Sequence, residues 1–201
     1  MTPIGAFVDD QRRVSETLTL VEHLNSQTVG ILDSSDVLRG AFASLLSSLD
    51  LFVHSRIRQE LMDQYQAGSI VTNVGRSLPV PLGLVGSVHS SPSLAWLDEA
   101  FEKKCGHLSF QDPKKISQAV SIVRDSSGLW DHVQQTCSIP EIRLQLKLQV
   151  DRRNQIVHES DRDPSDQSRL WSIDIDMVRR AAEVVDASVN GIESFLRTPS
   201  S

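Results

Sequence analysis

Arg153, Asn154 and His158 bring a permanent cation, an amide and an imidazole into one short stretch of the chain. A phosphodiester in RNA can be cleaved without a metal when one group transfers protons near neutral pH and a fixed cation stabilises the extra negative charge on phosphorus. Histidine and arginine are the side chains that supply these two properties. These three residues are therefore candidates for metal-independent phosphodiester chemistry.

The spacing of Arg153 and His158 restricts how they can act together. Five positions correspond to about 140° around a helix axis, so the two side chains do not share a face of one helix. They can meet if the helix loosens near His158, or if two copies pack so that each arginine meets the histidine of the other copy. In a simpler interpretation, His158 is favoured at the helix C-terminus by the helix dipole, and Arg152 and Arg153 are solvated.

The elements that position these residues are predicted to be helices, because apolar residues recur mostly at spacings of three and four. We expect an all-α helical bundle with an N-terminal extra helix and one long irregular loop. Residues 1–33 are predicted to form an N-terminal helical extension, and 34–201 the main helical domain. The expected helices are Pro3 to Asn25, Ser34 or Ser35 to Gln66, Ser93 to Lys104, Asp112 to Asp125, Leu129 to Thr136, Pro140 to His158, and Asp174 or Asp176 to Arg197.

The same periodicity predicts which residues are buried. The long loop is expected from Gly68 to Ser91, and a second, polar loop from Glu159 to Ser168, which contains Pro164. Asp161, Arg162 and Asp163 are expected to make loop and cap contacts without a chemical role. The predicted core residues are Ile4, Phe7, Val14, Leu18, Val21 and Leu24; Val37, Ala41, Leu45, Leu49, Phe52, Ile57, Leu61 and Tyr65; and Ile142, Leu146, Val150, Ile156 and Val157.

The overall composition limits the possible functions. The formal net charge is −6, so any contact with RNA must be local. No apolar stretch approaches the 18 or so residues that span a bilayer, and the N-terminus lacks the pattern of a signal peptide, so we expect a soluble, cytoplasmic protein without membrane contact. Cys105 and Cys137 are expected to be reduced thiols. We expect no metal and no cofactor, because no HExxH or Gly-rich phosphate-binding motif is present.

Two stretches of the chain resemble one known family. Arg152-Arg153-Asn154-Gln155-Ile156-Val157-His158 is similar to the signature of HEPN domains, in which four to six residues separate an arginine from a histidine and a polar residue often follows the arginine. The segment from Leu49 to Leu61 resembles the first core helix of the RiboL-PSP branch of that superfamily. Arg152 also satisfies the spacing, and the adjoining Asn154 favours Arg153.

This resemblance implies a metal-independent endoribonuclease that acts as a homodimer, with both Arg/His pairs in one cleft. It implies catalytic roles for Arg153, Asn154 and His158, and RNA as the substrate. Such proteins are commonly bacterial toxins or antiviral effectors restrained by an antitoxin or regulatory protein. Val80, Leu82, Leu84 and Val85 of the long loop are candidates for contacting that protein, or for folding over the chain's own core. The alternative is a non-catalytic helical module that binds RNA or a protein.

Overall fold

The computed structural model describes residues 1–28, 32–80 and 94–198, and its fold is all-α. The sheet among the described residues is a small two-stranded hairpin that lies between the last two helices. In chain order the elements are α1 (Pro3–Thr28), α2 (Ser35–Gln66), α3 (Asn73–Arg76), α5 (Ala95–Cys105), α6 (Pro113–Val120), α7 (Leu129–Thr136), α8 (Ile142–His158), β1 (Arg162–Asp163), β2 (Asp166–Leu170) and α9 (Ile175–Arg197).

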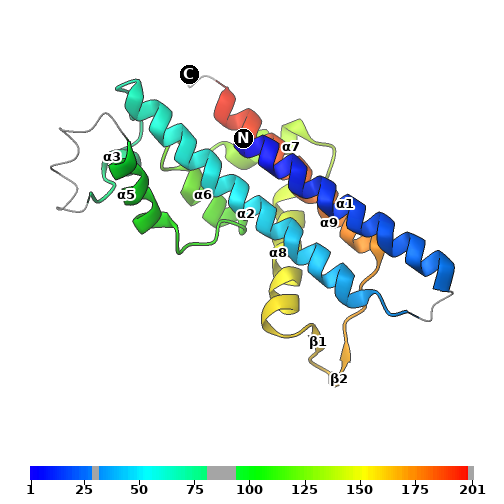
Figure 1. The fold of residues 1–201 in the computed structure, drawn as a ribbon. Coiled ribbons are helices and arrows are strands. Elements are labelled where there is room, and N and C mark those ends of the chain that lie inside the picture. Colours follow the sequence, from blue (N-terminus) through cyan, green and yellow to red (C-terminus); the bar gives the residue numbers. More distant parts are fainter. Residues whose placement is uncertain (29–31, 81–93, 199–201) are drawn as a thin grey trace.

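Helix α2 is the central element of the core. At about 1.5 Å per residue it is roughly 48 Å long, and it packs against α1, α9, α8, α5 and α6. Figure 1 shows α1 and α2 side by side, with α9 packed behind them. By length and composition alone α2 could cross a membrane, but 56% of its most apolar window is buried in the fold. Burial in the core therefore accounts for much of its apolar character.

Helix α8 crosses α2, and its C-terminal end projects away from the α1, α2 and α9 layer together with the hairpin (Figure 1). Ile142, Leu146 and Val150 form its buried stripe at the predicted positions. The next position on this stripe is Arg153, three residues after Val150. The packing of α8 therefore brings a cation to the edge of the core.

Most predicted helix ends are confirmed, and several have a clear physical cause. The side chain of Asp112 accepts a hydrogen bond from Lys114 N (2.9 Å) ahead of Pro113, and that of Asp174 accepts one from Met177 N (2.7 Å). Gly68 follows α2 with a φ of 66°, in the left-handed region that glycine adopts without strain. These caps and the glycine were recognisable in the sequence.

Some predictions were wrong. The polar segment from Glu159 to Ser168 is not only loop, because β1 pairs antiparallel with β2 within and just beyond it. The described part of the long loop contains the short helix α3, and α6 ends at Val120 rather than Asp125. Leu82, Leu84 and Val85 lie outside the described residues. Three predicted core residues are exposed instead, because they lie on outward faces of their helices: Leu24, Val37 and Val157.

Candidate functional site

Asp161 follows the C-terminal end of α8 by three residues and binds Arg152. Its side chain has no exposed surface, and both of its carboxylate oxygens accept hydrogen bonds from the Arg152 guanidinium, one of them at 2.9 Å from Nη2. Arg152 Nη2 also donates to the backbone oxygen of Ser172 (3.2 Å). The charge of Arg152 is therefore compensated within the fold, as expected for a structural ion pair.

A second arginine binds the same carboxylate from a distant part of the chain. Arg39, near the start of α2, donates from Nε to Asp161 Oδ2 at 2.7 Å and from Nη2 to the backbone oxygen of Trp171 at 2.8 Å. The backbone N–H of Trp171 in turn donates to the backbone oxygen of Asp161 (2.8 Å). This Arg39/Asp161/Arg152 cluster fixes the ends of α2, α8 and the hairpin relative to one another.

The backbone after α8 turns sharply to bring Asp161 into this position. Ser160 and Asp161 have φ values of 52° and 55°, in the left-handed region, which aspartate tolerates better than most residues. The Asp161 N–H then donates to the Gln155 backbone oxygen (3.0 Å), within the last turn of α8. Two charged hydrogen-bond partners for its carboxylate offset the cost of this backbone conformation.

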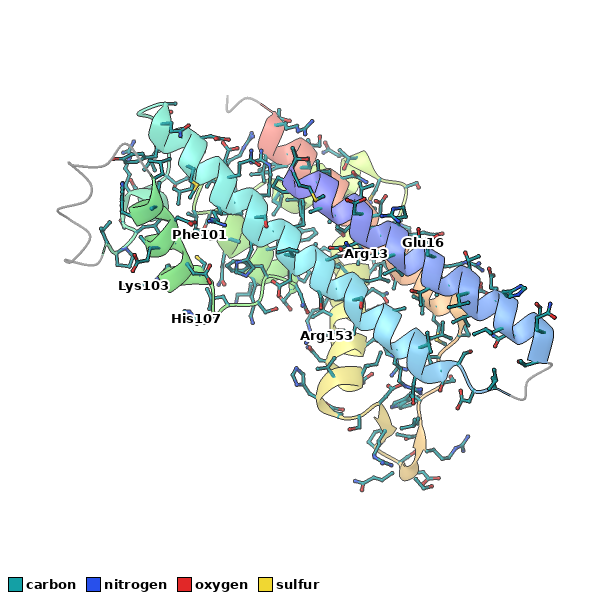
Figure 2. The ribbon with its side chains drawn as sticks, viewed as in Figure 1. Arg13, Glu16, Phe101, Lys103, His107 and Arg153 are labelled. Carbon is teal, nitrogen blue, oxygen red and sulfur yellow. The ribbon has the colours of Figure 1, made fainter. Side chains whose placement is uncertain are left out.

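Arg153 has a different environment from its neighbour Arg152. Figure 2 shows it on α8 close to where that helix passes α2 in this view. Its side chain is partly buried, and its Nε is buried without a hydrogen-bond partner among the described residues. Its one hydrogen bond there is a long one of 3.4 Å from Nη1 to the Asn154 side-chain oxygen. Within the described part of the chain, Arg153 is thus a cation without a carboxylate partner.

His158 is exposed at the end of α8, and its imidazole forms no hydrogen bond or ion pair with any residue that the structure describes. Because α8 remains helical to His158, the imidazole and the Arg153 guanidinium stay about 140° apart around the helix. Local loosening of the helix, one of the two predicted ways to bring them together, is not observed. A single copy of the chain therefore presents the two groups on different sides of α8.

Val157 and Asn154 lie between Arg153 and His158 on the circumference of α8. With about 100° per residue, the order around the helix is Arg153, Val157, Asn154 and His158, at steps of roughly 40°, 60° and 40°. Val157 keeps 47% of its surface exposed, although its neighbour Ile156 packs against the core. This edge of α8 combines an exposed apolar side chain with the three predicted site residues.

The sequence did not show which residues give Arg152 and Arg153 different charge environments. Arg39 and Asp161 are 122 positions apart, and no local pattern indicates that they meet. Asp161 was expected to make a loop contact, and its actual contact is the buried ion pair. In residues 1–28, 32–80 and 94–198, no group of three or more His, Cys, Asp or Glu side chains is arranged to hold a metal ion.

Comparison of the chain with protein-family models, with curated proteins and with solved structures gives no significant match.

Proposed function

We propose that this protein is a metal-independent endoribonuclease whose site is formed by Arg153, Asn154 and His158 from two copies of the chain. The observation that carries the proposal is the contrast between two adjacent arginines. Arg152 is compensated by a buried carboxylate, whereas Arg153 has an unsatisfied buried Nε and no acidic partner among the described residues. An unsatisfied buried donor costs about 1–3 kcal/mol, and a phosphate oxygen would satisfy it.

The resemblance to the HEPN signature supports the same residues. The signature alone left two arginines that met its spacing, and the Asp161 contact gives Arg152 a structural role. The cation available for a substrate is then Arg153, the one followed directly by Asn154. This agreement between the motif and the charge environment favours Arg153 as the catalytic arginine.

A symmetric dimer provides the geometry that one copy lacks. If two copies contact each other along the edge of α8 formed by Arg153, Val157, Asn154 and His158, a twofold axis brings both sets of side chains to one interface. This interface between the two α8 helices is called the seam. The exposed apolar side chain of Val157 lies in the middle of this edge and would be covered by the contact. The Arg153 guanidinium of one copy then lies across the seam from the His158 imidazole of the other.

In the proposed mechanism, a neutral His158 removes the proton from a ribose 2′-OH. The 2′-oxygen forms a bond to the adjoining phosphorus while the bond from phosphorus to the 5′-oxygen breaks. The protonated His158 of the other copy gives its proton to that leaving oxygen. Arg153 stabilises the charge on the phosphoryl oxygens, and Asn154 orients the phosphate or the imidazole. The products are a 2′,3′-cyclic phosphate and a 5′-OH.

The first experiment is incubation of the purified protein with total RNA in excess EDTA, beside His158→Ala. Cleavage by the wild type alone, with cyclic phosphate ends, supports the nuclease. Intact RNA accompanied by a mobility shift would instead select the non-catalytic binding module.

As a cytoplasmic nuclease, the protein would damage its own host unless a second protein or a trigger restrained it. We therefore propose that it acts as a toxin or antiviral effector. Expression of the wild type alone should then arrest growth, His158→Ala should not, and co-expression of a neighbouring gene should rescue growth. Harmless high-level expression of the wild type would contradict an unrestrained toxin.

A further inference from the structure

A groove of about 730 Å³ lies beside α8, and its lining residues Gln145, Gln149 and Gln155 are at other positions around the helix than His158. Its apolar lining includes Phe42 and Ile173. Polar side chains line its walls at positions that the proposed reaction does not use. They are Gln145, Gln149, Gln155 and the Asp161-bound Arg152 from α8, Trp171 and Ser172 from the segment after β2, and Arg180 and Glu183 from α9.

Trp171 is the most unusual of these residues. Its backbone is held at both ends, by the N–H bond to Asp161 O (2.8 Å) and by the Arg39 bond to its own carbonyl oxygen (2.8 Å). The residue nevertheless remains 42% exposed, whereas Trp96 and Trp130 are 8% and 9% exposed. The indole ring has no aromatic or hydrogen-bond partner in the described part of the chain. A fixed backbone with a free indole is a suitable stacking platform for a flat ligand.

Arg180 and Glu183 add charge to the groove without neutralising each other. Neither side chain forms a hydrogen bond or an ion pair with any residue in the described ranges. The adjacent Arg179, in contrast, is paired with Glu22 of α1. Arg180 is therefore an available guanidinium for a phosphate, and Glu183 an available carboxylate for ring N–H donors.

We infer that this groove binds a nucleotide of single-stranded RNA, with its base stacked on Trp171 and its phosphate on Arg180. Glutamine amides supply both donors and acceptors for base edges, and an unstacked base can present its Watson–Crick edge to them. Glu183 favours guanine, because adjacent N–H donors on that base match a carboxylate. The inference rests on the proposed function in that the ligand is its RNA substrate.

The position of the groove relates it to the reacting groups. Gln155, which lines it, is in the same last turns of α8 as Arg153 and His158. A strand whose base lies in the groove can therefore continue around the end of α8 towards the seam. The groove would then select the nucleotide flanking the cleaved bond, as flanking contacts select context in other enzymes that act on single strands.

The test measures binding of fluorescein-labelled single-stranded RNA hexamers by anisotropy in EDTA, in the His158→Ala background, so that the probe stays intact. Trp171→Ala should weaken binding by about tenfold or more, as expected when base stacking on an aromatic ring is lost. Trp171→Phe, which keeps a ring, should retain most of the affinity. Arg180→Ala should weaken binding several-fold, whereas the matched control Arg179→Ala should not, because Arg179 already has a partner. Glu183→Gln should reduce the preference for guanine over adenine hexamers.

Equal affinity of Trp171→Ala and its parent would overturn this inference even if the wild type cleaves RNA. Trp171-dependent binding by a protein that never cleaves RNA would support the groove and reject the nuclease. Absence of any RNA binding would overturn the groove, and so would equal losses for Arg179→Ala and Arg180→Ala. Thermal unfolding of each variant distinguishes lost contacts from lost folding, and Trp171→Phe provides the comparison if Trp171→Ala does not fold.

Discussion

The buried carboxylate of Asp161 binds Arg152 and leaves the adjacent Arg153 without an acidic partner among the described residues. Two neighbouring arginines thereby acquire different roles. Arg152 binds Asp161, which also binds Arg39 of α2, and we propose that Arg153 is the arginine that contacts a ligand. Stability and activity measurements on variants of the two arginines and of Asp161 separate these roles.

Arg153→Ala should abolish RNA cleavage, with a loss on the order of 100-fold or more, because it removes the proposed donor to the phosphoryl oxygens. Its thermal unfolding should change little, since Arg153 forms only the long bond to Asn154 in the described structure. The measurement is the cleavage rate of a defined RNA in EDTA beside a melting curve. Wild-type activity in Arg153→Ala would show that the wrong arginine was chosen.

Asp161→Ala should be strongly destabilising, because it leaves the guanidinium groups of Arg39 and Arg152 without their buried carboxylate. Removing one partner of a buried ion pair typically costs about 3–5 kcal/mol. Chemical denaturation measures the loss of stability. The matched control is Asp166→Ala, because the Asp166 carboxylate is exposed and, among the described residues, accepts hydrogen bonds only from Ser168. Equal stability of the two variants would contradict the structural role of the cluster.

Arg152→Ala should destabilise the protein and yet retain most of its activity when assayed well below its melting temperature. Arg39 still binds Asp161 in this variant, so the loss should be smaller than for Asp161→Ala. An inactive but stably folded Arg152→Ala, together with an active Arg153→Ala, would reverse the assignment.

Val157→Asp should prevent dimerisation and reduce cleavage, since it places a charge in the middle of the proposed seam. Leu144→Asp is the matched control: it is an exposed apolar residue of the same helix, 50% exposed and about 140° away from Val157 around the axis. Light scattering at micromolar concentration measures the oligomeric state of each. A dimer that survives Val157→Asp and dissociates with Leu144→Asp would place the contact on the other face of α8.

Cys105 should resist thiol reagents in the native protein, whereas Cys137 should react. Cys105 is 1% exposed, and burial raises the pKa of its thiol, so little reactive thiolate is present near neutral pH. Cys137 is partly exposed. Mass spectrometry after brief alkylation should find label on Cys137 alone, and both thiols should react in denaturant. Rapid native labelling of Cys105 would contradict the packing of α5.

Helical periodicity predicted most of this fold because it reports directly on burial. The stripe of Ile142, Leu146 and Val150 fixed the inward face of α8, and the capping aspartates marked where α6 and α9 begin. The hairpin was missed because β2 is exposed along its whole length and so lacks the alternation that identifies a strand. Its position depends on Asp161, whose contact with Arg39 spans 122 residues.

The candidate site was only partly predictable, because it too depends on contacts between distant parts of the chain. Its residue types and spacing are local and could be recognised, but the charge state of the surroundings depends on tertiary contacts. Ile156 and Val157 were both predicted to be core residues that anchor the end of α8, but Val157 is exposed where α8 projects beyond the core.

The most direct test of the central claim is the activity of mixed dimers. Wild-type protein and His158→Ala are mixed at equal amounts, allowed to exchange subunits, and assayed for RNA cleavage in EDTA at constant total concentration. If two copies supply both histidines to one cleft, only dimers of two wild-type copies are active. The rate then falls to about one quarter of that of wild-type protein alone. A rate of about one half would mean that each copy acts independently, and would contradict the shared site.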